Sequence, residues 1–202
     1  MSDAAPRASI AIVVFDGVEE LDFVGPWEVF SVAKQLGAPL EVFTVGWPGT
    51  TINCAKGLKI IADYDFAGKP RADVVLVPGG KGTRQLAEDD SFNAELRAYL
   101  AQAKWQTSVC TGAALLARAG FLEGRRATTN RGALDFLRAH APHTYILDQR
   151  YVHDGNVVTS AGVSAGIDMA LWLVGHLFGE DTAHSTQNHM EYFPEPPYGT
   201  PA

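Results

Sequence analysis

Cysteine is scarce in this sequence, and long apolar runs are missing. Only two cysteines, Cys54 and Cys110, occur among 202 residues, too few for the disulfide framework of a small secreted scaffold. No charged segment followed by an apolar one opens the chain, so no signal peptide is expected. The longest mostly apolar stretch, residues 169–178, is too short to span a bilayer. We therefore expect a soluble, cytoplasmic protein with no membrane partner.

Basic residues are also in the minority. Lys and Arg number 16 against 23 Asp and Glu, which gives a formal net charge of −7 at pH 7. A general nucleic-acid binder needs a basic face, so we expect no nucleic-acid partner. The sequence has no internal repeat, low-complexity segment or break in composition. Residues 1–202 are therefore predicted to form a single domain.

An alternation of strand and helix patterns fills most of the chain. The continuous β-branched segment at residues 9–15 is typical of a strand buried on both faces of a parallel sheet. Further strands are predicted at residues 40–45, 73–77 and 106–109, with short strands within 51–61 and 145–159. Helices are predicted at residues 25–36, 91–103, 111–119, 132–140, 162–178 and 181–190, before an irregular tail at 194–202. This order predicts an α/β fold with a mainly parallel central sheet.

Cys110 stands at the junction between a predicted strand and a predicted helix. Such a junction pushes a side chain out of the sheet, as in a nucleophile elbow. The helix N-terminus beside it presents free N–H groups and partial positive charge, which favour the thiolate and lower the thiol pKa. Thr111 adds a hydroxyl and an N–H. The alternative is a buried cysteine that serves as a small apolar side chain, and we interpret Cys54 in that way.

Two other predicted strands end at the same edge of the sheet, where ligands bind in α/β folds. Asp22, with Glu19 and Glu20, follows the first strand, where a carboxyl could exchange a proton with a thiol or merely cap a helix. Gly79 and Gly80 follow the third strand and could bring backbone N–H groups to a developing anion, or merely form a tight strand exit. The six histidines lack the spacing of a zinc site, so no metal is predicted.

Five ordered segments resemble the ThiJ/PfpI (DJ-type) superfamily over about residues 8–190. Within that superfamily, the chain looks most like the isonitrile (isocyanide) hydratase branch. The matching segments are residues 15–26, 77–80, 107–113, 122–129 and 157–168. The resemblance implies a flavodoxin-like three-layer sandwich with an ordered core at about residues 8–190, a homodimer, no cofactor and a small electrophilic substrate.

The resemblance also implies roles for individual residues. Cys110 would be the elbow nucleophile, and Asp22 would be the family's active-site carboxyl. Backbone N–H groups near Gly80 and Thr111 would face the reacting centre and stabilise an oxyanion or the thiolate. Gly79 would line the pocket beside them.

One position departs from the family's pattern. Many relatives have a histidine near the cysteine where this chain has Asn130, followed by Arg131. Asn130 cannot act as a general base, which disfavours protease, amidase and glyoxalase-type chemistry that depends on the histidine. Hydratase chemistry would depend on Cys110 and Asp22 and is affected less. Asn130 is therefore predicted to line an altered pocket.

Three functions remain open on these residues. The leading hypothesis is an isocyanide hydratase-like lyase, in which Cys110 attacks R–N≡C and Asp22 moves the proton, yielding an N-substituted formamide without a cofactor. The second is other cysteine chemistry on a small electrophile, such as hydration of a dicarbonyl or a biosynthetic step. The third is non-enzymatic, because an exposed thiol of low pKa beside a carboxyl can form a stabilised sulfinate as an oxidation sensor.

Overall fold

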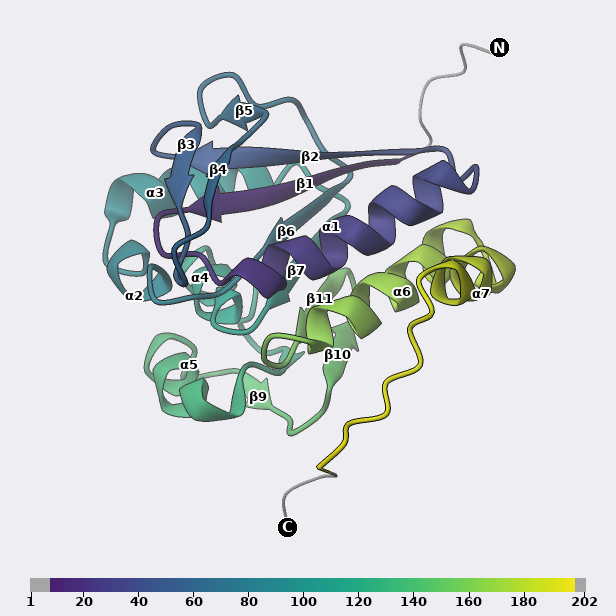
Figure 1. The fold of residues 1–202 in the computed structure, drawn as a ribbon. Helices are drawn as coiled ribbons and strands as arrows, with labels where there is room; N and C mark the ends of the chain where they lie inside the picture. The colour runs from purple at the N-terminus through teal and green to yellow at the C-terminus, as the bar shows by residue number, and fades with distance from the viewer. Residues whose placement is uncertain (1–7, 199–202) are drawn as a thin grey trace.

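The computed structural model describes residues 8–198 and contains a seven-stranded central sheet (Figure 1). The strand order is β10-β11-β7-β6-β1-β2-β5. All neighbouring strands in it are parallel except β10 and β11. The strands are β1 (Ala8–Phe15), β2 (Leu40–Trp47), β5 (Tyr64–Asp65), β6 (Val74–Val77), β7 (Trp105–Val109), β10 (Tyr151–Asp154) and β11 (Val157–Ser160). The predicted mainly parallel sheet is confirmed.

Helices cover both faces of this sheet, which gives the three layers of a flavodoxin-like fold. Figure 1 shows α1 (Glu20–Gln35), α6 (Ala165–Phe178) and α7 (Glu180–His189) side by side on one face. The other face carries α3 (Asp90–Leu100) and α4 (Gly112–Arg118). The remaining elements are α2 (Thr83–Leu86), α5 (Leu134–His140), the short helix η1 (Arg131–Ala133), and the strand pairs β3 (Thr51–Asn53) with β4 (Lys59–Ile61) and β8 (Arg126–Ala127) with β9 (Tyr145–Ile146).

The burial of β1 follows from its position in the middle of the sheet. Its residues from Ile10 to Phe15 have no exposed surface, because a helix layer lies over each face of the strand. On one of these faces Phe15 meets Phe92 of α3 edge to face, with ring centroids 6.5 Å apart. The continuous β-branched pattern of this strand thus reports burial on both sides.

The start of α1 differs from the prediction. The sequence pattern put it at Gly25 and Pro26, but the helix begins at Glu20 and contains Pro26 in its interior. The earlier start is fixed from outside the helix, since the Glu19 N–H donates to the Gly79 carbonyl at 2.9 Å. Glu20 and Asp22 in the first turn also suit the positive end of the helix dipole. The consequence is that Asp22 is a helical residue at the carboxyl edge of the sheet.

Three short elements were not predicted, namely α2, β5 and β8, each of four residues or fewer. The tail predicted to be irregular has neither helix nor strand from residue 194 to 198, and residues 199–202 lie outside the described range. Within residues 8–198, no helix combines the length and apolar character needed to cross a bilayer.

Candidate active site

Cys110 follows β7 directly and is separated from α4 by Thr111 alone, at the carboxyl edge of the sheet. Its φ of 55° is left-handed, which is uncommon for a residue other than glycine and costs free energy unless the surroundings enforce it. The Cys110 N–H donates to the carbonyls of Ser160 and Ala161 at 3.0 and 3.2 Å. The Thr129 hydroxyl donates to the Cys110 carbonyl at 2.8 Å. These bonds hold the strand–turn–helix geometry of an elbow.

Asp22 lies in the first turn of α1 and has no exposed surface. Its Oδ2 accepts the Gly79 N–H at 2.9 Å. The carboxyl lies beside the Cys110 thiol, and a hydrogen bond between the two lowers the pKa of Asp22. The structure therefore brings together the two residues that the sequence analysis proposed as proton carrier and nucleophile.

Three groups can donate hydrogen bonds to the Cys110 sulfur. They are the N–H and the hydroxyl of Thr111 and the N–H of Val163, and each lowers the pKa of the thiol. Donors placed in this way favour negative charge on the sulfur or on an atom bonded to it. The site can thus hold an anion without a metal ion or a basic side chain next to the sulfur.

Burial acts in the opposite direction on both acids. It raises the pKa of Asp22 to about 7, although the Gly79 hydrogen bond lowers it. Burial, followed by the charge of Asp22, raises the pKa of Cys110 to about 12. The expectation of a lowered thiol pKa is wrong, because removing the sulfur from water outweighs the N–H donors beside it. The pair therefore loses one proton near neutral pH and keeps a second, which either acid can carry.

Gly79 contacts the pair directly through its bond to Asp22, whereas Gly80 acts on the pair through Thr111. A Cβ at Gly79 would lie 2.6 Å from the Thr111 nitrogen and 2.8 Å from Asp22 Oδ2, so only glycine allows this approach. The Gly80 N–H donates to Thr111 Oγ1 at 3.0 Å and is not free to bind a reacting anion. Gly80 therefore supports Thr111, whereas the sequence analysis had placed its N–H directly on the reacting centre.

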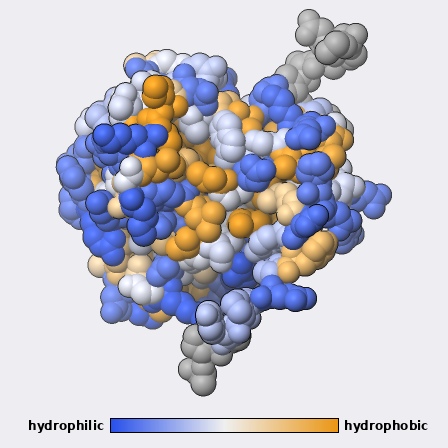
Figure 2. Space-filling view, viewed as in Figure 1, coloured by the Kyte–Doolittle hydropathy of each residue, from blue (hydrophilic) through white to orange (hydrophobic). Residues whose placement is uncertain are grey.

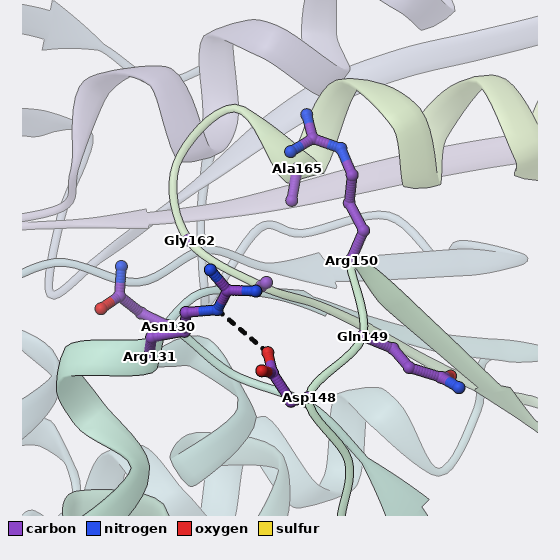
Figure 3. Close-up of a pocket in the computed structure, with 8 residues that line it drawn as sticks. Asn130, Arg131, Asp148, Gln149, Arg150, Gly162 and Ala165 are labelled. Carbon is purple, nitrogen blue, oxygen red and sulfur yellow. Dashed lines mark hydrogen bonds and ion pairs between the residues drawn. The ribbon is translucent and has the colours of Figure 1, made fainter. Parts of the chain in front are cut away.

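Asn130 lines a cavity of about 400 Å³ next to the loop after β11. Figure 3 shows Arg131 and Asp148 pointing toward each other at this cavity, with Nε and Oδ1 3.0 Å apart. The Asn130 amide lies so close to Gly162 that a Cβ there would be 2.0 Å from Nδ2. Ala161 also lines the cavity, and its carbonyl accepts the Cys110 N–H. The cavity therefore lies next to the site, and the backbone of Ala161 is the link between the two.

Sequence reasoning missed Val163, whose N–H reaches the sulfur. A signal was available, because residues 157–159 were predicted as part of the short strands within 145–159 and the segment after them lies at a strand end. In the sheet, Ser160 of β11 pairs with Val109, the residue before Cys110. Parallel pairing therefore places the segment that follows β11 beside the cysteine.

The other residues considered in the sequence lie outside the pair. Glu19 is ion-paired with Lys56 at 2.7 Å, and Glu20 accepts the Lys56 N–H at 2.7 Å, so both tie the β3–β4 hairpin to α1. Cys54 is buried after β3, and burial raises its pKa to about 11. Among residues 8–198, no three His, Cys, Asp or Glu side chains are arranged to hold a metal ion.

Comparison with known proteins identifies relatives along nearly the whole chain. Isonitrile hydratase from Pseudomonas putida is 37% identical over 189 residues, which cover 94% of this chain and 80% of that protein. The HTH-type transcriptional regulator GbdR from Pseudomonas aeruginosa is 28% identical over 187 residues, 91% of this chain but 50% of the regulator. With a transcriptional regulator among the relatives, the predicted absence of a nucleic-acid partner is not confirmed.

Solved structures agree with the sequence relatives. The crystal structure of a ThiJ/PfpI family protein from Pseudomonas syringae superposes with a TM-score of 0.87 at 33% identity, covering 94% of this chain and 77% of that one. The model of the DJ-1/PfpI family matches residues 8–176. On the strength of that match, and of a fold and relatives that agree with it, the chain belongs to the DJ-1/PfpI family.

Proposed function

We propose that this protein is an isocyanide hydratase that converts R–N≡C and water into the N-substituted formamide. The observation that carries the proposal is the buried pair of Asp22 and Cys110, with hydrogen-bond donors around the sulfur. A relative named isonitrile hydratase, 37% identical, supports the same chemistry. The pair needs no cofactor for this reaction, because both the nucleophile and the proton carrier are side chains of the chain.

In the first half of the reaction, the pair supplies one sulfur and one proton. The Cys110 sulfur bonds to the terminal carbon of the isocyanide, and the single proton held by the pair is delivered to that carbon by Asp22. The product is a thioimidate, R–N=CH–S–Cys110. Asp22 is then an ionised carboxylate, and the donors from Thr111 and Val163 stabilise the sulfur while it carries negative charge.

In the second half, water adds to the thioimidate carbon. The Asp22 carboxylate takes a proton from the water as its oxygen bonds to carbon, and the nitrogen gains that proton to give R–NH–CH(OH)–S–Cys110. The hydroxyl proton then returns to Asp22 as the C–S bond breaks. The formamide leaves, and the pair is restored with one shared proton.

The decisive experiment is a formamide assay with p-nitrophenyl and cyclohexyl isocyanide on wild type, Cys110→Ala and Asp22→Asn. We expect turnover in the wild type, none above background in Cys110→Ala, and a loss of at least about a hundredfold in Asp22→Asn. Glu88→Gln, on an exposed residue, serves as a carboxyl control with unchanged turnover. Absence of formamide from the wild type with Cys110 reduced would refute the proposal.

The same preparations test the two alternatives of the sequence analysis. Lactate formed from methylglyoxal by the wild type but not by Cys110→Ala would support dicarbonyl hydration. A gain of two oxygens on Cys110 under mild peroxide, in a protein inert toward isocyanides, would support an oxidation sensor. The sensor hypothesis assumed an exposed thiol of low pKa, whereas Cys110 is 7% exposed and its pKa is raised by burial.

We also propose a homodimer built on an exposed apolar surface. Large apolar side chains of α1 and the β3–β4 hairpin remain in contact with water, among them Leu21 at 38%, Leu58 at 46% and Ile61 at 81% exposure. Figure 2 shows this surface as an orange area over the start of α1 and the hairpin. A two-fold interface would cover it. Ile61→Glu is expected to give a monomer in light scattering, and a wild type that is itself monomeric would refute the dimer.

Two broader assignments stand as proposals beside the activity. A single domain over residues 1–202 is supported by one continuous hydrophobic core that joins β1 to α6 within the described residues. A cytoplasmic location is supported by the two free, buried cysteines, which form no disulfide.

A further inference from the structure

Two arginine side chains line the cavity beside Asn130, and the mechanism above gives neither of them a task. Figure 3 shows Arg131 on one side of this cavity with Asp148, and Arg150 on the other side by Ala165. We propose that the cavity holds the R group of the isocyanide and that the two guanidinium groups bind a carboxylate on it. This substrate class, isocyanides with an acidic R group, rests on the proposed hydratase function.

The cavity and Cys110 share two stretches of backbone. The Ala161 carbonyl, at the cavity wall, accepts the Cys110 N–H at 3.2 Å. Asn130, also at the wall, directly follows Thr129, whose hydroxyl donates to the Cys110 carbonyl at 2.8 Å. The Gly79 side of the site is closed, because a Cβ there would lie 2.6 Å from a backbone nitrogen. A group joined to the sulfur through the isocyanide carbon therefore has room on the side of the loop after β11.

The lining of this cavity suits a charged group better than an alkyl chain. A bare alkyl group would bury little apolar surface there, because the apolar lining residues are small, namely Ala161, Gly162 and Ala165. The other lining residues are polar or charged, namely Asn130, Arg131, Asp148, Gln149 and Arg150. A planar guanidinium presents paired N–H groups that match the two oxygens of a carboxylate. The volume of about 400 Å³ leaves room for a benzene ring between the carboxylate and the isocyanide carbon.

Arg150 is held in place by groups outside the cavity lining. Its Nε donates to Asp168 Oδ2 at 2.7 Å, and its Nη2 is 3.4 Å from both Ser164 Oγ and Tyr192 Oη. The Tyr192 hydroxyl also donates to Asp168 Oδ2 at 3.1 Å. Within residues 8–198, Nη1 of Arg150 donates to no other residue. The guanidinium is therefore fixed in position and keeps donors for a ligand.

Arg131 is held by a weaker contact. Its Nε is 3.0 Å from Asp148 Oδ1, and the two side chains are 77% and 71% exposed. An ion pair exposed to this extent contributes little to stability. Arg131 can therefore exchange Asp148 for a substrate carboxylate at little cost, while Arg150 stays on Asp168. Asp148 also repels the incoming carboxylate, so its neutralisation should strengthen binding.

Binding of the reaction product tests the cavity without turnover. The Kd values of p-formamidobenzoate and of its uncharged methyl ester are measured on the wild type by isothermal titration calorimetry. We expect the carboxylate to bind at least about tenfold more tightly than the ester. It should also protect Cys110 from alkylation by iodoacetamide, followed by mass spectrometry of the Cys110 peptide. Equal affinity of the two compounds, or tight binding of the carboxylate without protection of Cys110, would overturn the proposal.

Variants of the two ion pairs identify the groups that bind the carboxylate. Arg150→Met should remove the preference for the carboxylate and change the Kd of the ester by less than about twofold. The double variant Arg150→Met/Asp168→Asn should lose the preference too, which separates the lost donors from the charge left on Asp168. Asp148→Asn should tighten carboxylate binding by up to about fivefold, because Arg131 is then free. Arg97→Met is the control, since Arg97 lies on α3 at a different cavity.

Two results with these variants would contradict the proposal. One is a preference for the carboxylate that survives in a folded Arg150→Met/Asp168→Asn. The other is an Arg97→Met variant that loses as much affinity for the carboxylate as Arg150→Met does, because net charge alone would then explain the effect. Circular dichroism establishes that each variant is folded before its Kd is compared with that of the wild type.

The consequence for turnover is measured separately. In the formamide assay, p-isocyanobenzoate should have a kcat/KM at least about tenfold above that of its methyl ester, mainly through KM, and Arg150→Met should remove this difference. Tight, Arg150-dependent binding of p-formamidobenzoate with no turnover of any isocyanide would refute the hydratase and retain the carboxylate site. Turnover of p-nitrophenyl isocyanide together with equal Kd values for p-formamidobenzoate and its ester would retain the hydratase and overturn the carboxylate site.

Discussion

Asp22→Asn should make the protein more stable at neutral and alkaline pH while it lowers the proposed activity by at least about a hundredfold. Asp22 is fully buried, and burial raises its pKa from 3.8 to about 7 in the folded state. In the unfolded chain the carboxyl ionises near 3.8. The folded state therefore holds one more proton than the unfolded state between these two values. The free energy of unfolding must therefore fall as the pH rises through this interval, because the folded state binds more protons there than the unfolded state does.

The magnitude follows from the size of that shift. At about 1.4 kcal/mol per pKa unit, the whole interval from 3.8 to about 7 corresponds to about 4 kcal/mol. The part above pH 5 corresponds to about 3 kcal/mol. Asparagine has nearly the same shape, can still accept the Gly79 N–H through its amide oxygen, and does not ionise. The free energy of unfolding of Asp22→Asn, relative to that of the wild type, should therefore increase by about 3 kcal/mol between pH 5 and pH 8.

Equilibrium urea unfolding at half-unit steps from pH 5 to pH 8.5 measures this difference. All other ionisable groups are common to the two proteins, so the difference between the curves reports Asp22 together with its coupling to Cys110. Asp90→Asn, whose side chain is 99% exposed, is the control and should run parallel to wild type. An Asp22→Asn advantage that stays constant with pH, or a variant less stable than wild type at pH 8, would show that Asp22 is ionised in the folded protein well below pH 7.

Three further outcomes are expected from the same geometry. The kcat/KM of the proposed hydratase should rise with pH through an apparent pKa of about 7, as the pair of Asp22 and Cys110 loses its first proton; a profile flat from pH 5 to 9 would contradict this. Gly79→Ala should abolish turnover and lower stability by about 1–3 kcal/mol in urea unfolding, because its Cβ would lie 2.6 Å from the Thr111 nitrogen. Thr129→Val should cost about 1–2 kcal/mol and slow turnover, because Cys110 loses the hydrogen bond to its carbonyl; wild-type kinetics would show that this bond does not hold the elbow.

The sequence was sufficient to place Cys110 at the edge of the sheet. A buried strand that ends directly before Cys110 and a helix that begins two residues after it leave little choice for the backbone, and the residue has a φ of 55° at that junction. Local patterns also located most helices and strands, since a parallel sheet covered on both faces requires continuous apolar strands. These local patterns did not predict the start of α1 correctly. Proline favours the first turn of a helix, but a hydrogen bond from Glu19 to the Gly79 carbonyl begins the helix earlier.

Two properties of the site depended on the tertiary structure alone. Val163 is 53 positions from Cys110 in the sequence, and only the pairing of β11 with β7 brings its N–H to the sulfur. The sequence analysis also expected a lowered thiol pKa, because a helix N-terminus lowers it, and it did not include the burial that raises it. The sequence by itself placed a cysteine at the edge of a parallel sheet, and the resemblance to a known family singled out Asp22 as the carboxyl beside it. The packing of α1 and α4 around them removed both acids from water, and this desolvation decided which of the two effects prevails.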